Sequence, residues 1–261
     1  PFIAGGDPRA YETLPRMEVT LPSFLISKFP VTLGEYLDFV NALEGTDPQA
    51  ARERLPRNRY EGTICERDET GRWVPNHALL FEGEARKRYP DRAHALKLPV
   101  LCVRWYDAVA YIRWRSARDG IPYRLPTELE WEKAARGVDG RFFPWGNHHE
   151  PTYCKMQNSR PEPTQPEPIG IFEQDCSPYG VRDMAGSMKD WTASVYERRK
   201  FSNELLDPDA PPSPNILVVV RGGGWNSSTR SIRCANRDAS PPTARKTALG
   251  FRLVRPLPSG S

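Results

Sequence analysis

The feature that most constrains this chain is a segment near its C-terminus with firm apolar ends and a soft polar middle. It begins at Arg221-Gly-Gly-Gly-Trp225, ends at Gly250-Phe-Arg-Leu-Val254 and is rich in small polar residues between them. The aliphatic run at 216–220 just before it is typical of a buried strand, and the three glycines let the backbone turn sharply or pack closely. A flexible tether would not leave Trp225 and Phe251 together in water. An ordinary surface loop and a binding surface both fit this composition.

Length and charge narrow the classes of partner. The chain has 261 residues, enough for one large domain or two small ones. Its 37 basic and 33 acidic residues give a net charge of +4, too balanced for the concentrated basic face that nucleic acid needs. No run approaches the roughly 18 apolar residues of a membrane span, so we expect no membrane insertion. The chain starts at Pro1 without a signal peptide, which fits the C-terminal part of a longer protein, and its compartment, intracellular or cell-surface, stays open.

The cysteines and histidines do not predict a metal site. The cysteines form no C-x-x-C pair and their number is odd, which indicates buried or idle thiols rather than a disulfide framework; they are Cys65, Cys102, Cys154, Cys176 and Cys234. His148 and His149 are adjacent, so their side chains diverge on most backbones, and a surface pair is favoured over a pair of metal ligands.

Three stretches carry helical signals. Thr32-Leu-Gly-Glu35 is a capping-box pattern, and the apolar spacing after it predicts one buried helical stripe that Gly45 ends. The spacing of apolar residues over 105–117 predicts a second helix. Thr127-Glu-Leu-Glu130 is a second capping box, and it opens a helix that stops at Gly137.

The rest of the chain has weaker patterns. Residues 17–27 predict an edge strand, and residues 46–97 predict an irregular insertion with one short hairpin around Trp73. Trp131, in the third predicted helix, and Trp191 lie among apolar residues and are expected in the core. Helices followed by turns and short strands favour an α+β domain over an alternating βαβ one.

A set of motifs spans nearly the whole chain, all but residues 46–97. They are Phe29-Pro-Val-Thr-Leu-Gly-Glu-Tyr36, Pro99-Val-Leu-Cys-Val-Arg-Trp-Tyr-Asp-Ala108, Tyr123-Arg-Leu-Pro-Thr-Glu-Leu-Glu-Trp-Glu-Lys-Ala-Ala-Arg-Gly137, Phe143-Pro-Trp-Gly-Asn147, Tyr179-Gly-Val-Arg-Asp-Met-Ala-Gly186, Arg221-Gly-Gly-Gly-Trp225 and Gly250-Phe-Arg252. Together these motifs resemble the formylglycine-generating-enzyme family. The resemblance implies an α+β C-type lectin fold of that family's type, in a single domain over residues 1–261, with two main helices, short twisted strands and much irregular structure.

The same resemblance bears on activity. The family's oxidases hold copper with two cysteines five residues apart; Cys234 matches the second, but Thr229 stands where the first would be. A hydroxyl is a poor ligand for Cu(I), which prefers thiolates, so the resemblance implies a chain that is not an enzyme and has no catalytic residue or metal. Its sulfoxide-synthase relatives bind iron through histidines of a separate helical domain, which is not found in this sequence. We expect no cofactor; calcium stays open, although the Gly-Asn pair that supplies one family site reads Gly186-Ser187 here.

The C-terminal segment has a further likeness of its own. Its fixed points are Arg221-Gly-Gly-Gly-Trp-Asn226, Arg233, Ala235-Asn-Arg237, Pro242, Arg245 and Gly250-Phe-Arg-Leu-Val254. They resemble the variable proteins of diversity-generating retroelements. In that family an Asn-rich template is copied with errors confined to adenines, and an AAC codon so altered yields Ser, Thr, Ile, Asp, Ala or Gly, among others. These are the residue types between the fixed points, except for Lys246, which an AAG or AAA template codon would explain.

This second resemblance implies a binding module. We expect diversified, solvent-facing positions to contact a protein ligand; they are Ser227, Ser228, Thr229, Ser231, Ile232, Asp238, Ala239, Ser240, Thr243, Ala244, Lys246, Thr247 and Ala248. We expect a scaffold beneath them that consists of Trp225, Arg233, Asn236, Arg237 and Phe251, with Arg230 and Arg252 as further anchors. Solvated surface charge is the alternative for each arginine.

The functional hypotheses belong to different classes. The first is a non-enzymatic ligand-binding protein whose segment 221–254 displays a diversified surface on a C-type lectin scaffold. The second is a copper oxidase of the formylglycine-generating type, a sulfoxide-synthase-like enzyme, or a degenerate relative of either. A fusion to an N-terminal signalling domain, such as a kinase, is compatible with the first.

Overall fold

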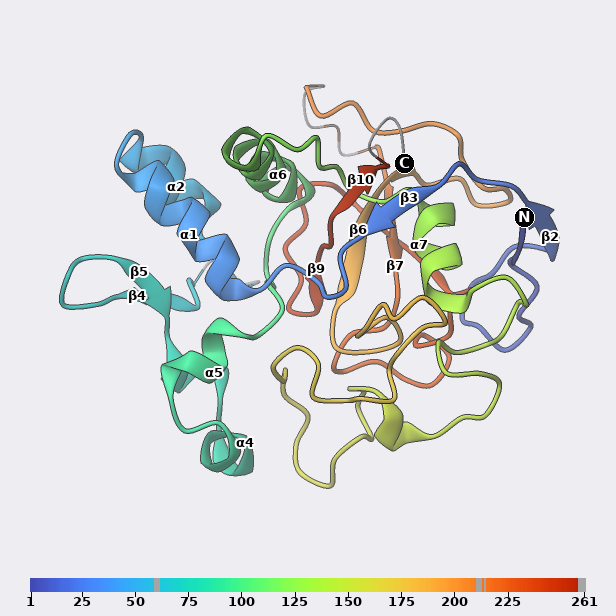
Figure 1. Cartoon of the computed structure of the whole chain (residues 1–261). Helices are drawn as coiled ribbons and strands as arrows, with labels where there is room; N and C mark the ends of the chain where they lie inside the picture. The colour runs from blue at the N-terminus through green and yellow to red at the C-terminus, as the bar shows by residue number, and fades with distance from the viewer. Residues whose placement is uncertain (59–61, 210–212, 214, 258–261) are drawn as a thin grey trace.

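The chain folds as an α+β structure in which helices and short strands are separated by long loops (Figure 1). The computed structural model describes residues 1–58, 62–209, 213 and 215–257. Its helices are α1 (Leu33–Glu44), α2 (Pro48–Arg54), α3 (His77–Leu80), α4 (Gly83–Arg88), α5 (Arg92–Leu96), α6 (Trp105–Asp119), α7 (Glu128–Arg136) and the 3-10 turn η1 (Pro151–Tyr153). Its strands are β1 (Phe2–Ala4), β2 (Met17–Val19), β3 (Phe24–Ile26), β4 (Cys65–Arg67), β5 (Trp73–Pro75), β6 (Lys189–Val195), β7 (Val218–Arg221), β8 (Arg237–Ser240), β9 (Leu249–Gly250) and β10 (Val254–Pro256).

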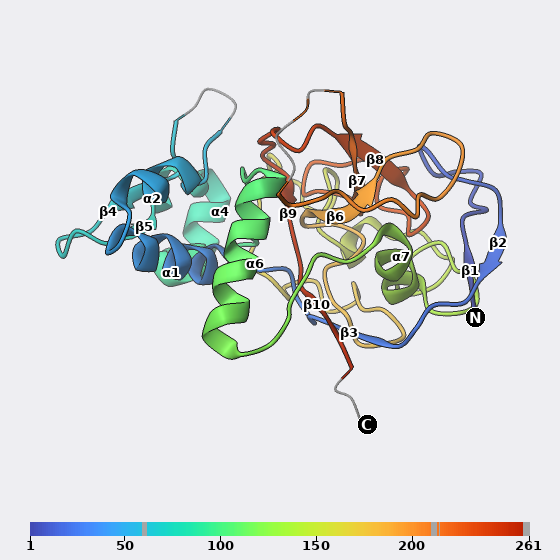
Figure 2. The same cartoon turned by 90° about the horizontal axis from the view of Figure 1, so that it is seen from above.

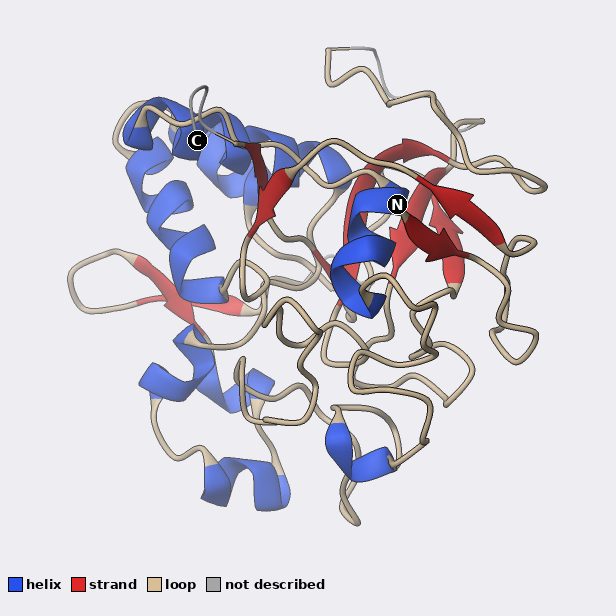
Figure 3. Ribbon diagram, turned by 45° about the vertical axis from the view of Figure 1, so that its right-hand side comes forward, coloured by secondary structure: helices blue, strands red, loops and turns tan. Residues whose placement is uncertain are grey.

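The first two helices and the first two strands lie at opposite ends of the molecule (Figure 2). Seen from above, α1, α2 and the β4–β5 hairpin lie at one end, β1 and β2 lie at the other, and α6 stands between the first group and the sheet (Figure 2). Much of the remaining chain is loop (Figure 3). Within the described residues, no helix is long and apolar enough to cross a membrane.

The predicted helix signals are confirmed. In α1 the Glu35 backbone amide donates to Thr32 Oγ1 at 3.2 Å, and the Thr32 amide donates to Glu35 Oε2 at 2.9 Å. Helix α7 has the same reciprocal cap, between Thr127 and Glu130. Helix α6 ends at Gly120, whose φ is 68°. The structure thus has three longer helices, α1, α6 and α7, where the family resemblance implied two main helices.

Residues 46–97 are more regular than the sequence indicated. The hairpin around Trp73 is confirmed, with β4 antiparallel to β5, but α2, α3, α4 and α5 contradict an irregular insertion. Asp47, Asn76 and Asp91 begin α2, α3 and α5 by accepting a backbone N–H through their side chains. Each of these short helices buries a single residue, such as Ala51 in α2, so the sequence has no apolar period to recognise.

The main sheet has the strand order β8-β7-β6-β9. Strand β7 is antiparallel to both β6 and β8, whereas β9 is parallel to β6. The edge strand predicted over 17–27 is two strands instead, because Pro22 lies between β2, which pairs with β1, and β3, which pairs with β10.

Aromatic side chains join the helices to the end of the chain. Tyr36 of α1 and Tyr111 of α6 stack at 5.8 Å between ring centroids, and Phe251 contacts both rings edge-on. Trp131 and Trp191 are buried, as predicted, with 1% and 0% of their surface exposed. The residues after β9 are therefore part of the main core.

We predict that Trp131→Ala lowers the free energy of unfolding by about 3–5 kcal/mol, because it leaves a cavity and removes the indole donor to Asp190. Tyr179→Ala is the matched control, since Tyr179 is 52% exposed and its loss should change stability by no more than about 0.5 kcal/mol. Urea unfolding of both variants measures the difference. Equal stability of the two variants would refute the placement of Trp131 in the core.

Candidate functional site

The C-terminal segment supplies both edge strands of the main sheet, β8 and β9. Strand β7 leads into a long turn over 222–236, β8 returns beside β7, and residues 241–248 cross to β9. Gly222 has a φ of 79°, and a Cβ there would lie 2.9 Å from Cζ2 of Trp131. A Cβ on Gly223 would lie 2.6 Å from both the Ala185 oxygen and Cγ2 of Ile232. These two glycines therefore let the turn lie directly on the core.

Buried arginines join this segment to the rest of the chain. Each pairs with a carboxylate: Arg221 with Glu132, Arg233 with Asp7, Arg237 with Glu128 and Arg252 with Asp190. All four arginine side chains are at most 5% exposed. The Arg237 Nε–Glu128 Oε2 distance is 2.7 Å, and the Arg237 guanidinium also donates to the Glu197 oxygen. Losing one partner of such a pair is costly, because the remaining charge is buried without compensation.

The carboxylates of these pairs come from outside the segment. Glu128 and Glu132 lie on α7, Asp190 lies in β6, and Asp7 follows β1. Asp190 Oδ2 accepts from Arg252 Nε at 2.6 Å and also from the Trp131 indole at 2.8 Å. The backbone of the segment is therefore held by groups that the segment does not contain.

The predicted scaffold residues lie largely where expected. Arg233, Asn236, Arg237 and Phe251 are buried, as the sequence predicted. Trp225 is only partly buried, and its indole donates to the Thr247 oxygen at 3.0 Å. Four of the five predicted scaffold residues are therefore buried, and their role in ligand binding stays a prediction.

Arg252 is a buried anchor, whereas Arg230 is an exposed one with a single long hydrogen bond. Arg252 is fully buried in its pair with Asp190. The Arg230 side chain is exposed, and its Nη2 lies 3.4 Å from the Ala10 oxygen. The guanidinium covers the exposed ring of Tyr11 instead. Arg230 therefore anchors one backbone oxygen but no carboxylate, and its side chain stays exposed to solvent.

Most of the predicted surface positions reach solvent. The exposed ones are Thr243, Lys246 and Thr247, and the partly exposed ones are Ser228, Thr229, Ser231, Asp238, Ala239 and Ala244. Asp238 forms an ion pair with Lys189. Burial of the Asp238 carboxyl raises its pKa, but the charge of Lys189 and the hydrogen bonds to the carboxyl leave the pKa below its ordinary value. The exposed positions therefore come from the turn, from β8 and from residues 241–248.

Four predicted surface positions are buried instead: Ser227, Ile232, Ser240 and Ala248. Ile232 is the clearest correction, because its side chain occupies the space that Gly223 leaves open. It packs there with Phe143 and Met156 in a small apolar cluster. Its residue type fits the diversification pattern, but its side chain is part of the core.

Local geometry explains the other three corrections. Ser227 Oγ accepts from the Gly224 amide at 2.9 Å and so closes the turn. Ala248 covers Gly224, where an added Cβ would lie 2.5 Å from the Ala248 Cβ. Ser240 is opposite Val218 in the sheet and is fully buried.

The positions that correspond to the copper cysteines do not fit copper. Thr229 Oγ1 lies 3.1 Å from Nε2 of His149. Cys234 is buried, and desolvation raises the pKa of its thiol far above its usual range. A two-coordinate Cu(I) site needs two sulfur ligands, and this pair offers one sulfur atom and one hydroxyl. Across residues 1–58, 62–209, 213 and 215–257, no three His, Cys, Asp or Glu side chains are grouped to hold a metal ion.

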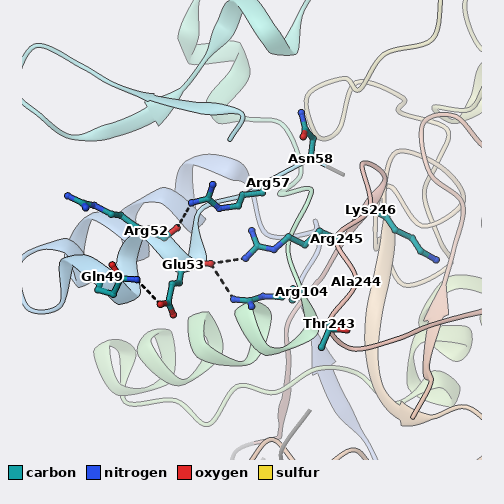
Figure 4. A pocket seen from close by; sticks show the side chains of 10 residues that line it. All are labelled: Gln49, Arg52, Glu53, Arg57, Asn58, Arg104, Thr243, Ala244, Arg245 and Lys246. Carbon is teal, nitrogen blue, oxygen red and sulfur yellow. Dashed lines mark hydrogen bonds between the residues drawn. The ribbon is translucent and has the colours of Figure 1, made fainter. Parts of the chain in front are cut away.

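A cleft of about 890 Å³ lies where the segment meets α2 (Figure 4). Its lining residues are Gln49, Arg52, Glu53, Arg57, Asn58, Arg104, Thr243, Ala244, Arg245 and Lys246. The predicted surface residues Thr243, Ala244 and Lys246 thus line a cleft whose other wall the sequence did not suggest. The arginines at 52, 54 and 57 were the available signal, but nothing in the sequence placed them beside residue 245.

The fold and the C-terminal segment together define an α+β domain of the C-type lectin-like, formylglycine-generating-enzyme type. The chain belongs to the FGE-sulfatase family, since residues 2–257 match its model, described as a sulfatase-modifying factor enzyme 1-like domain. The fold predicted from the sequence motifs is therefore confirmed.

Relatives in this family carry different names. The serine/threonine-protein kinase Pkn1 of Chlamydia trachomatis is 30% identical over 97% of this chain, which spans only 36% of Pkn1. The inactive C-alpha-formylglycine-generating enzyme 2 of Mus musculus is also 30% identical, over 92% of this chain and 77% of its own. The formylglycine-generating enzyme of Bos taurus is 29% identical, with 92% and 67% covered. The family thus includes proteins named as enzymes and proteins named as inactive.

Solved structures show the same fold. PvdO from Pseudomonas aeruginosa superposes with a TM-score of 0.67 at 23% identity, covering 98% of this chain and 91% of its own. Treponema denticola variable protein 1 superposes with a TM-score of 0.62 at 19% identity, with the same coverage of 98% and 91%.

We predict that Arg237→Ala lowers the free energy of unfolding by about 3–5 kcal/mol, because Glu128 is left buried without its partner. Arg230→Ala, which removes an exposed arginine of the same segment, should cost no more than about 0.5 kcal/mol. Urea denaturation compares them. If both variants lost equally little stability, the buried pair would not be an anchor.

Proposed function

We propose that this chain is a non-enzymatic binding protein whose C-terminal segment displays a diversified surface to a protein ligand, as in variable proteins of diversity-generating retroelements. The observation that carries the proposal is the contrast within the segment. Four of its arginines are buried on carboxylates outside it, while small side chains between them reach solvent. Such a segment can change its contact surface without changing its support.

The physical advantage of this arrangement is preorganisation. A loop that is ordered on folding does not lose that conformational entropy again when it binds, so modest side chains can contribute to affinity. The exposed positions and the anchors are different residues, even where they are close in sequence. Ser231 reaches solvent, whereas Arg233 two residues later is buried. The likeness to the Treponema variable protein is one of fold, so the proposal rests on these residues.

An enzyme of the formylglycine-generating type is the second candidate. Cys234 and the bovine relative favour it, but Thr229 in place of the other cysteine and the burial of the Cys234 thiol oppose it. We infer that the chain does not perform the copper-dependent oxidation.

We also propose that the chain belongs to a longer protein with a signalling domain. The support is the relation to Pkn1, of which the matched part is 36% of the length. A protein ligand bound to the C-terminal segment would then either regulate that signalling domain or be recruited to it.

We predict that a library randomised at Ser228, Ser231, Thr243 and Thr247 yields folded binders when displayed and selected on a purified protein such as lysozyme. Each exposed substitution should change stability by no more than about 0.5 kcal/mol. Thermal melting of selected clones and of unselected clones measures this tolerance.

The control library is randomised at the buried positions Ser227, Ile232, Ser240 and Ala248 of the same segment. Most of its members should fail to fold cooperatively. If the first library unfolded as often as the second, its positions would be structural and the proposal would fail.

A separate prediction concerns the second candidate. The purified chain should neither bind Cu(I) tightly nor convert the cysteine of a sulfatase-type peptide to formylglycine, because Thr229 leaves Cys234 without a second sulfur ligand. Mass spectrometry of the peptide after aerobic incubation with Cu(I) detects conversion. Turnover of more than one peptide per chain would overturn the non-enzymatic assignment.

A further inference from the structure

The loop between β1 and β2 is joined to the long turn that follows β7. The Tyr11 backbone amide donates to the Arg230 oxygen at 3.3 Å, and the Arg237 amide donates to the Glu12 oxygen at 2.9 Å. Asp7, in the same loop, supplies the carboxylate of one of the buried ion pairs described above. The loop therefore has a fixed position beside the C-terminal segment, although it comes from the opposite end of the chain.

Tyr11 projects from this loop into solvent. Its exposed fraction of 71% is larger than that of any other large apolar side chain among the described residues. The ring is nevertheless restrained, because the Arg230 guanidinium lies 5.3 Å from its centroid, within the range of a cation–π contact. Arg230 Nη2 also donates to the Ala10 oxygen at 3.4 Å, which keeps the guanidinium at the loop.

The predicted surface positions of the C-terminal segment that reach solvent contain no such side chain. They are Ser, Thr, Ala, Asp and Lys residues, and none is aromatic. A protein–protein interface covers roughly 800 Å² on each partner, and a few residues, often Tyr, Trp or Arg, contribute most of its binding energy. Tyrosine offers a large contact area and loses little conformational entropy when it binds. Tyr11 thus supplies, beside the segment, what these positions lack.

We propose that Tyr11, positioned by Arg230, is a constant contact for the protein ligand, and that an apolar depression on the ligand receives its ring. The inference rests on the proposed function and adds a contact residue from outside the C-terminal segment. Arg230 lies between Thr229 and Ser231, which are both partly exposed, so a protein bound over Ser231 would also reach Tyr11.

The two kinds of contact would have different effects on recognition. The open side of the Tyr11 ring faces solvent while the Arg230 guanidinium occupies the other side, so the ring can enter a concave apolar surface without first being ordered. Tyr11 lies outside the C-terminal segment and would add affinity for many ligands. The exposed positions of the segment would then decide which of these ligands binds.

The test uses lysozyme-binding clones from the library of exposed positions described above. Biolayer interferometry measures the dissociation constant of each clone for lysozyme with the original Tyr11, with Tyr11→Phe and with Tyr11→Ala. Tyr179→Ala is the matched control, because Tyr179 is also exposed, at 52%, but lies outside this loop. Thermal melting of every variant checks that it is folded.

We expect Tyr11→Ala to weaken binding about tenfold in most clones, because it removes the ring that the ligand encloses. Tyr11→Phe keeps the ring and should retain most of the affinity, and Tyr179→Ala should have no effect. All three variants should melt at the temperature of the parent clone, since both tyrosines are exposed. Equal dissociation constants for the Tyr11→Ala and Tyr179→Ala forms would overturn the proposal.

Arg230→Ala tests whether Arg230 acts through the ring. Its loss should weaken binding about threefold in clones that contain Tyr11, and should have no further effect in the same clones with Tyr11→Ala. An equal loss in both backgrounds would contradict the positioning role. Folded binders that are indifferent to Tyr11 would remove this inference alone, whereas a library without folded binders would remove the proposed function as well.

Discussion

Buried arginine–carboxylate pairs connect the C-terminal segment to the rest of the chain and hold it in place. Helix α7 is the centre of this arrangement, because Glu128 pairs with Arg237, Glu132 pairs with Arg221, and Trp131 shares the Asp190 carboxylate with Arg252. Such pairs add little net stability compared with apolar packing, but each one strongly disfavours any conformation that separates its partners. They therefore specify the path of the segment more than they stabilise the fold.

A segment held in this way can carry different side chains on its open side. Its shape depends on α7, β6 and the residues after β1, none of which belongs to it. The same design extends to the cleft, where Arg245 is fixed by backbone oxygens of Glu53 and Leu55 while the neighbouring Lys246 stays exposed. Support and contact surface are thus made by different residues, and we infer that this separation is what the binding function uses.

Local signals in the sequence predicted part of this architecture. The helix caps at Thr32 and Thr127 could be predicted because a capping box involves residues only three positions apart. The family motifs implied the fold and the buried scaffold. The burial of Ile232 could not be predicted from the sequence. It depends on the absence of a side chain at Gly223, and the two residues come into contact only in the folded turn. The cleft was missed for a similar reason: Arg245 and Glu53 are 192 residues apart in sequence.

Amide hydrogen exchange of the wild type and of Glu128→Gln tests the central claim most directly. The amides of Ser231, Cys234 and Leu249 are hydrogen-bonded within or beneath the segment. The account predicts that they are protected in the wild type, and that Glu128→Gln reduces their protection much more than that of Tyr36 in α1, because Arg237 loses its closest carboxylate. Rapid exchange of the segment in the wild type, or an equal loss of protection at Tyr36, would contradict it.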